Sequence, residues 1–348
     1  MRKLFPSLKE WKNLYQAAIE FKKIESWKWM YDTDLFGVQN PKSKEIGYCC
    51  ILGSLGEFFS LNVYLGSRGL QGYLKIRSGQ IEPGDIESLS VQDCLSASFT
   101  DKNDLRDKDL ETIKKLGLKF RGKNNWPLFR RYEPGFYPWY IDKDDAKFLI
   151  LALKQAKEVA LQVKENKDLL TLEHNLLLVR IPEKKGKKLI WKEEWIEPAP
   201  PHRKEIIIPE VDEERIEGLR NEILRKEGCW EVDFFFSPFT IQEKKDERPY
   251  YPYTCLFLDH KTGLIIGSEI SNHSEYKKEF QDRFLSIINE NNIIPEEVLV
   301  KRDIVYRLFR PITRGLDIKI KMVKRLEGIK EAKYSMIEYM MKNPPPDF

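Results

Sequence analysis

The amino-acid sequence predicts a mixed α+β protein that folds as two domains. At 348 residues the chain is long for a single core and suits two domains of ordinary size. Hydrophobic residues make up 41% of the chain and aromatic residues 12%, which is enough apolar surface for both halves to fold. Segments with helical and with strand periodicity alternate along both halves, so neither an all-α nor an all-β fold is expected.

The first half predicts an α+β domain over residues 1–197. Ser7 is a suitable N-cap for an amphipathic helix over residues 7–24, and Asp142 for the longest helix, over residues 143–166. A shorter helix is expected after Asp107 or Asp109, with Gly117 as its stop. Apolar stretches predict the strands of this domain at residues 46–52, 58–65, 94–99, 176–181 and 188–195.

The second half predicts a separate domain over residues 212–348. Three of the four residues 198–201 are prolines, which excludes a helix or a central strand, so residues 198–211 are predicted to be the linker. A charged helix capped by Asp212 and a strand over residues 230–236 follow. Residues 250–320 then predict strand, tight turn, strand, helix, strand, helix and strand, and a last helix covers residues 327–341.

This order of elements resembles the ribonuclease-H-like fold of polynucleotide-cutting enzymes. Asp259 ends the first strand of residues 250–320 and Asp303 ends the third. In the integrase branch, the resemblance implies carboxylates on strand one, after strand four and on a later helix, where they hold Mg²⁺ or Mn²⁺ for two-metal catalysis. Asp259, Asp303 and Glu338 occur in that order, and Glu338 follows Asp303 by 35 residues. A metal-dependent nuclease is therefore one interpretation.

The phase of the last helix argues against a complete metal site. At about 100° per residue, Glu338 falls opposite the apolar face of its helix, so its carboxylate is expected in solvent. Asp259 also suits hydrogen bonding within the turn closed by Gly263, and Asp303 can equally cap the helix that follows it. The sequence favours a non-enzymatic protein without a cofactor. The alternative is a nuclease that uses Asp259, Asp303 and an unidentified third acid.

Cations are concentrated near the end of the chain. The net charge is only +4, yet residues 301–333 contain eleven Lys or Arg against four Asp or Glu. A local positive field attracts phosphate, so Arg307, Arg310 and Arg314 are candidates for binding nucleic acid or a protein partner. A solvated helix face and a lysine-protected strand edge explain the same residues without a ligand. The sequence leaves both interpretations open.

A second candidate surface is the aromatic and basic stretch of residues 119–141. Its eight aromatic side chains alternate with basic residues. Trp126 could stack on unpaired bases while Arg130 and Arg131 follow the phosphate backbone of a single strand. Three prolines in the same stretch favour instead a rigid loop packed on the core.

Other motifs indicate little chemistry. The five cysteines contain no CxxC pair and the four histidines lie far apart, so no metal site is predicted. Scattered cysteines in odd number, without a signal peptide or a long apolar run, predict a cytoplasmic protein that has no contact with a membrane. Gly66, Gly69 and Gly72 lack the spacing of a phosphate-binding loop.

Three segments carry a family resemblance, residues 29–39, 48–72 and 248–259. Together they resemble an uncharacterised bacterial family in which two domains of unknown function occur in tandem. The resemblance spans most of both halves and implies a bacterial cytosolic origin and a boundary near residue 198. It implies no activity, cofactor or catalytic residue. The sequence thus predicts a recognition or scaffold protein with a basic C-terminal surface.

Overall fold

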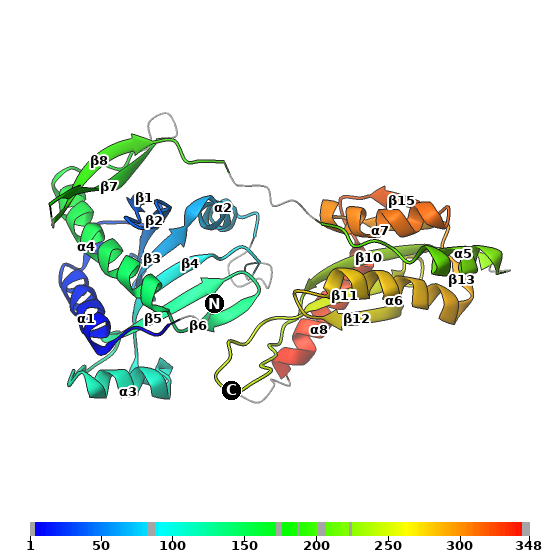
Figure 1. Cartoon of the computed structure of the whole chain (residues 1–348), viewed down its shortest axis with the longest axis horizontal. Coiled ribbons are helices and arrows are strands. Elements are labelled where there is room, and N and C mark those ends of the chain that lie inside the picture. The colour runs from blue at the N-terminus through cyan, green and yellow to red at the C-terminus, as the bar shows by residue number, and fades with distance from the viewer. Residues whose placement is uncertain are drawn as a thin grey trace. The chain divides into compact units, whose positions relative to one another are not determined.

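The computed structural model divides the chain into two compact units, Met1–His202 and Arg203–Phe348. It describes residues 4–81, 88, 90–171, 176–186, 188–200, 207–222 and 225–342. The division falls inside the predicted linker, of which residues 201–206 lie outside the described residues. Both units combine helices with a mixed sheet, so the predicted α+β class is confirmed (Figure 1). We call the two units the N-terminal and the C-terminal domain.

The N-terminal domain is built on an eight-stranded sheet in the order β6-β5-β4-β3-β2-β1-β7-β8. Strands β1 to β6 pair antiparallel in succession. β7 joins β1 in parallel, with Gly37 beside Val179, and β8 pairs antiparallel with β7 at the edge. The strands are β1 (Phe36–Gln39), β2 (Ile46–Leu52), β3 (Phe59–Leu65), β4 (Cys94–Thr100), β5 (Trp126–Glu133), β6 (Phe136–Trp139), β7 (Leu177–Lys185) and β8 (Lys188–Ile196).

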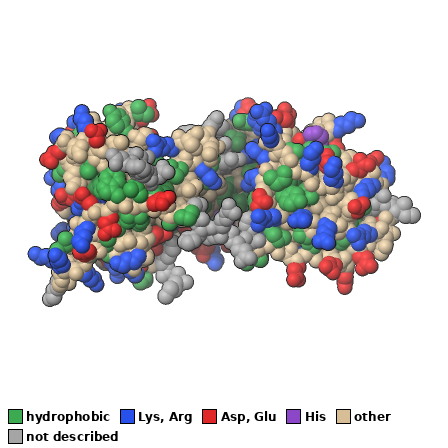
Figure 2. Space-filling view, turned by 90° about the horizontal axis from the view of Figure 1, so that it is seen from above, with side chains coloured by type: hydrophobic (Ala, Val, Ile, Leu, Met, Phe, Trp, Pro, Cys, Tyr) green, Lys and Arg blue, Asp and Glu red, His purple; other side chains and the backbone are tan. Residues whose placement is uncertain are grey.

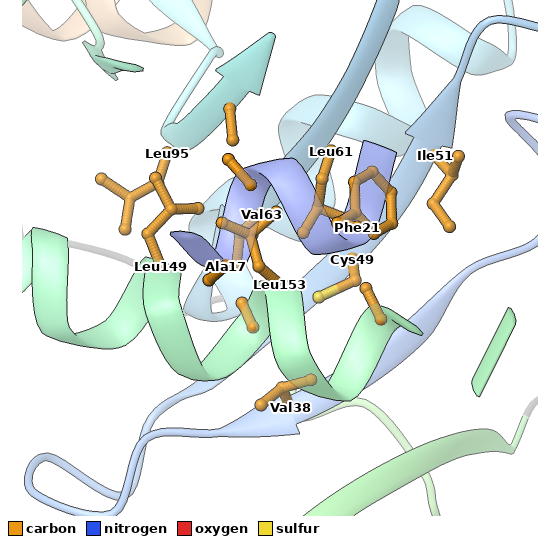
Figure 3. Packing of buried hydrophobic residues seen from close by; sticks show 14 of the residues in the cluster. Ala17, Phe21, Val38, Cys49, Ile51, Leu61, Val63, Leu95, Leu149 and Leu153 are labelled. Atoms are coloured by element: carbon orange, nitrogen blue, oxygen red, sulfur yellow. The ribbon is translucent and has the colours of Figure 1, made fainter. Parts of the chain in front are cut away.

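Helices cover both faces of this sheet. α1 (Leu8–Lys23) and α4 (Lys143–Glu165) begin at the predicted caps Ser7 and Asp142, each of which accepts backbone amides of the first turn. They form the main core with one sheet face, where Phe21 and Leu153 meet strand residues such as Leu61 (Figure 3). α2 (Gly66–Arg77) packs on the opposite face. α3 (Asp107–Lys115) follows β4.

The period of two along β2 explains why both faces can be buried. Cys49 and Ile51 lie in the core under α1 and α4, while Tyr48 and Cys50 lie in the cluster under α2. Adjacent Cys49 and Cys50 therefore point to opposite faces, and both are free thiols, as expected. Burial raises the pKa of both thiols, so neither is poised as a nucleophile.

The C-terminal domain is built on a five-stranded sheet in the order β12-β11-β10-β14-β15. β11 pairs antiparallel with both neighbours, whereas β10, β14 and β15 are parallel. In chain order the strands stand 3-2-1-4-5, which is the arrangement of a ribonuclease-H-like domain, so the predicted fold class is confirmed. The strands are β10 (Cys229–Phe236), β11 (Tyr253–Asp259), β12 (Ile265–Ser271), β14 (Glu297–Val300) and β15 (Lys319–Met322).

The helices of this domain again lie on both faces of the sheet. α5 (Glu213–Asn221), α6 (Tyr276–Asn291) and α7 (Asp303–Gly315) share one core with Trp230, Val232 and Phe234 of β10. α8 (Glu327–Lys342) covers the other face over Phe235. Two short strands, β9 (Arg225–Lys226) and β13 (Ile293–Ile294), form a separate parallel pair. No helix in the described ranges has the length and apolar character needed to cross a bilayer.

Candidate functional site

β10 and β14 are parallel neighbours, and β14 ends beside the middle of β10. Trp230 pairs with Val298 and Glu231 with Leu299. Asp233 stands further along β10, and Arg302 and Asp303 follow the end of β14. These are the positions at which the integrase resemblance implies the first and second carboxylates. β10, and not β11, is the first strand of the fold, so Asp233 takes the place that the sequence assigned to Asp259.

Arg302 pairs directly with Asp233. Its Nε and Nη2 atoms donate to Oδ1 of Asp233 at 2.9 and 2.6 Å, and Nη2 also donates to the carbonyl oxygen of Phe234. The guanidinium lies 4.6 Å from the centre of the Phe234 ring. The backbone amide of Phe234 donates to the same carboxylate oxygen at 2.9 Å. Three donors therefore converge on one oxygen of Asp233.

The carboxylate of this ion pair is buried, whereas the guanidinium is partly exposed. Asp233 is 8% exposed, and the Arg302 side chain is 39% exposed. Burial raises the pKa of Asp233, while the charge and hydrogen bonds of Arg302 act to lower it. A guanidinium this close also opposes a second cation at the carboxylate. Within the described residues, no group of three His, Cys, Asp or Glu side chains could hold a metal ion.

Asp303 and Glu338 are also paired with cations. Asp303 is the first residue of α7, and its carboxylate lies 2.8 Å from Nε of Arg307 on the surface. Glu338 is exposed on α8 and accepts from Nζ of Lys342 at 2.7 Å. The predicted exposure of Glu338 is thereby confirmed. Each of the three carboxylates that follow the integrase order, counted from Asp233, faces a positive charge instead of another carboxylate.

Asp259 lies at the opposite end of the sheet from Asp303. It pairs with Trp230 near the start of β10, whereas Asp303 follows the carboxyl end of the parallel strand β14. Its Oδ1 accepts from the amide and the hydroxyl of Thr262 at 2.8 and 2.7 Å. These hydrogen bonds lower the pKa of Asp259. Gly263 closes the turn at φ +69°, which supports the turn interpretation of Asp259.

Glu231, the second acid on β10, holds the start of α8. Its side chain is buried, with Oε2 accepting the backbone amide of Ile329 at 3.0 Å and Oε1 lying 2.7 Å from Nδ1 of His260. A carboxylate at the first turn of a helix satisfies an otherwise unpaired amide and favours the helix dipole. Both acids of the central strand are thus bound to neighbouring protein groups. Two acids within an otherwise apolar strand, residues 230–236, are the sequence feature that could have drawn attention to Glu231 and Asp233.

The three arginines that the sequence singled out in this domain belong to α7. Arg307, Arg310 and Arg314 are exposed and follow one another at three and four residues, while the apolar side of the helix packs on the core. Among the described residues, neither Arg310 nor Arg314 has a carboxylate within 4 Å. Lys319 and Lys321 are exposed on the neighbouring edge strand β15. Figure 2 shows Lys and Arg side chains spread over this face of the C-terminal domain, at the right of the view.

In the N-terminal domain, the residues predicted to bind nucleic acid lie in ion-paired or packed positions. Residues 126–139 form the hairpin β5–β6 in place of the expected loop. Arg130 is 7% exposed and binds both oxygens of Asp109 at 3.0 and 2.6 Å. Arg131 forms a second pair, with Asp93, whose side chain is 9% exposed. The side chains of Arg130 and Arg131 are 9% and 12% exposed, which favours the packed alternative that the sequence left open.

Trp126 contributes to the same core. Its ring is partly buried against the main hydrophobic cluster, and its centre lies 5.8 Å from that of Phe120. This packing favours the alternative that the sequence left open, in which the aromatic residues hold the segment on the core. The exposed cations of the segment lie earlier, at Lys119, Arg121 and Lys123.

Two family models match separate parts of the chain. Residues 11–180 match a family model described as Domain of unknown function (DUF7309). Residues 215–337 match a second model, Domain of unknown function (DUF6930). Among curated proteins there is no match.

Three solved structures show weak similarity. A chain of the simian T-cell lymphotropic virus intasome in complex with a PP2A regulatory subunit is 12% identical with a TM-score of 0.25, over 36% of this chain and 45% of that chain. The HTLV-2 integrase catalytic core domain in complex with magnesium is 17% identical with a TM-score of 0.24, over 36% of this chain and 79% of that one. The Mos1 transposase paired-end complex is 12% identical with a TM-score of 0.21, over 56% and 60%. The chain thus spans less than half the length of the first of these.

Proposed function

We propose that this protein, which carries the two domains of unknown function in tandem, is a non-enzymatic nucleic-acid-recognition protein. Its C-terminal ribonuclease-H-like domain binds the phosphate backbone through the exposed arginines of α7 and leaves the strand intact. The observation that carries the proposal is the ion pair between Asp233 and Arg302. The two-domain organisation itself assigns no activity, since fold and function are separable.

The chemistry of phosphodiester cleavage explains why this pair matters. Two metal ions about 3.5–4 Å apart must bridge the attacking and leaving oxygens, and carboxylates must compensate their charge. Here Asp233 and Asp303 face Arg302 and Arg307, so the four side chains carry no net charge. Such a site lacks the negative potential that concentrates divalent cations. It is compatible with bound phosphate.

The geometry of α7 suits a polyanion. Arg307 and Arg314 stand seven residues apart, which is about 10 Å along a helix. A nucleic-acid strand presents a phosphate about every 3.4 Å along the helix axis, so several phosphates pass over this length. Arg310, between them, has no carboxylate within 4 Å among the described residues, and its charge is therefore available to a phosphate.

Fluorescence anisotropy with labelled single-stranded and duplex oligonucleotides tests the proposal on the full chain. Binding should weaken as salt rises, because bound phosphates release counterions. Replacing Arg310→Ala together with Arg314→Ala should reduce the slope of log affinity against log salt by about two. Lys244→Ala with Lys245→Ala is the matched control, since it removes two exposed charges from the loop between β10 and β11. It should leave the slope unchanged.

Three results would overturn the proposal. Affinity that is equal in the arginine variant and the wild type would exclude the α7 surface. Failure of every oligonucleotide to bind at low salt would exclude nucleic acid as the ligand. Cleavage of the oligonucleotides in Mg²⁺ or Mn²⁺ that disappears in Asp233→Asn would establish the nuclease alternative instead.

A further inference from the structure

A hollow of about 390 Å³ opens on the N-terminal domain beside the end of α1. It lies between the last turn of α1, the buried ring of Phe99 on β4 and the segment 119–127. Its volume falls within the range of small-molecule sites. No residue of the α7 surface contributes to it, so it is independent of the function proposed above. We call it the basic hollow.

Four cations line the basic hollow against one carboxylate. Lys23, Lys119 and Arg121 are exposed, and none of them has a carboxylate within 4 Å in the described part of the chain. Lys22 donates to two neutral oxygens, the carbonyl of Asn124 and the side chain of Asn125. The lining carboxylate, Glu25, is paired outside the set with Lys28. Four cations against the one carboxylate of Glu25, which also acts on Lys22, leave the hollow with an excess of positive charge.

The remaining wall is apolar and contains an aromatic ring. Phe120 lines the hollow and is half-buried, together with Ile19 and Pro127. The Phe120 ring packs against Tyr15, whose ring centre lies 6.1 Å away at an interplanar angle of 28°, and against Trp126 at 5.8 Å. A fixed ring offers a flat ligand a stacking surface at little cost in side-chain entropy.

The segment that carries the cations is held in place. Asn124 adopts φ +52°, and its amide donates to Oδ1 of Asp101 at 2.7 Å. The Asn125 side chain donates to the carbonyl of Arg121 at 2.7 Å. Lys22 joins the same segment to α1 through its bonds to the two asparagines. The backbone that carries Lys119 and Arg121, and the ring of Phe120, are thus held in place, which reduces the cost of binding.

We infer that the basic hollow binds a small ligand that combines a planar ring with a phosphate, as a nucleoside monophosphate does. The ring lies against Phe120, and the phosphate accepts charge-assisted hydrogen bonds from Lys119, Arg121 and Lys23. A free nucleotide and the 5′-phosphorylated end of a nucleic-acid strand share this chemistry.

Isothermal titration calorimetry of the full chain with AMP tests the inference. AMP should bind with saturation, and adenosine and inorganic phosphate should each bind at least about tenfold more weakly, because each lacks one of the two determinants. Lys119→Ala with Arg121→Ala should lower AMP affinity by at least about tenfold. The matched control, Lys9→Ala with Lys12→Ala, removes two exposed cations from the other end of α1 and should bind AMP as the wild type does.

A second variant separates the ring from the phosphate. Phe120→Leu keeps an apolar side chain in place and should weaken AMP binding while leaving inorganic phosphate unchanged. A 5′-phosphorylated oligonucleotide that binds more tightly than both AMP and the unphosphorylated oligonucleotide would support the strand end as the source. Adenosine binding equal to AMP, or no heat with millimolar AMP while thermal unfolding confirms a folded protein, would overturn the inference.

Discussion

Arg302 compensates the negative charge of Asp233, because its guanidinium lies 2.6 Å from Oδ1 of that residue. Replacing Arg302→Met removes the charge and leaves a carboxylate that is 8% exposed without its partner. We expect the free energy of unfolding to fall by about 1–3 kcal/mol, less than for fully buried pairs because Arg302 is 39% exposed. Urea unfolding at neutral pH measures the change.

A neutral partner supplies the control for this prediction. In the Arg302→Met background, Asp233→Asn removes the unpaired charge and should restore part of the lost stability. Because the folded-state pKa of Asp233 is raised, its ionisation costs stability as pH rises through that pKa. Asp233→Asn should lack this component in the acid range. Equal stability of Arg302→Met and wild type at neutral pH would contradict the structural role of the pair.

Arg130 and Arg302 show that residue type alone does not tell whether a charge is available to a partner. Both were visible in the sequence as members of basic stretches, and both lie in ion pairs with acids distant in the chain, Asp109 and Asp233. Arg310 and Arg314 have the same side chain and stay in solvent. Composition predicts the positive field of a segment, while only the packing decides which charges remain available to a partner.

At the scale of elements, α2 shows why its glycines are placed at intervals of three. A Cβ atom on Gly72 would lie 2.0 Å from the carbonyl oxygen of Val91, and one on Gly69 would lie 2.6 Å from that of Asp93. The helix therefore packs directly on the backbone that leads into β4. The glycines allow this close approach, and they have no phosphate-binding spacing.

Two glycine replacements in helices should consequently have opposite effects. Gly72→Ala should lower the free energy of unfolding by about 1–3 kcal/mol through overpacking, although alanine favours helix. Gly218→Ala in α5 is the matched control, since a Cβ there meets no atom within 4 Å. It should raise stability by about 0.5–1 kcal/mol. Thermal and urea unfolding measure both, and stabilisation by Gly72→Ala would exclude the close packing of α2.

Elements with a complete local signal agree closely with prediction. α1, α4 and β2 begin and end within one residue of their expected positions, because caps and periodicity determine them. The hairpin β5–β6 was expected as a loop, since prolines at 127, 134 and 138 argue against strands. Pro127 lies near the start of β5, where it pairs with Phe99 of β4. Pro138 lies on the edge strand β6, where no further strand requires its amide.

At the scale of the whole molecule, the two domains should fold independently. Each has its own hydrophobic core, and the division lies after His202. We expect fragments 1–202 and 203–348 each to unfold in one cooperative transition when produced separately. Circular dichroism during urea unfolding measures this. A fragment without a cooperative transition would contradict the proposed boundary.

The fold class, the tandem domains, the helix caps and the basic character of residues 301–333 were predicted from the sequence, because they depend on local chemistry and composition. The sequence also placed Glu338 in solvent from helical phase alone. The tertiary structure decided that β10 is the central strand, that Asp233 and not Asp259 stands beside the end of β14, and that Arg302 neutralises it. Strand order brings together residues about 70 positions apart, and no local pattern specifies which strands become neighbours.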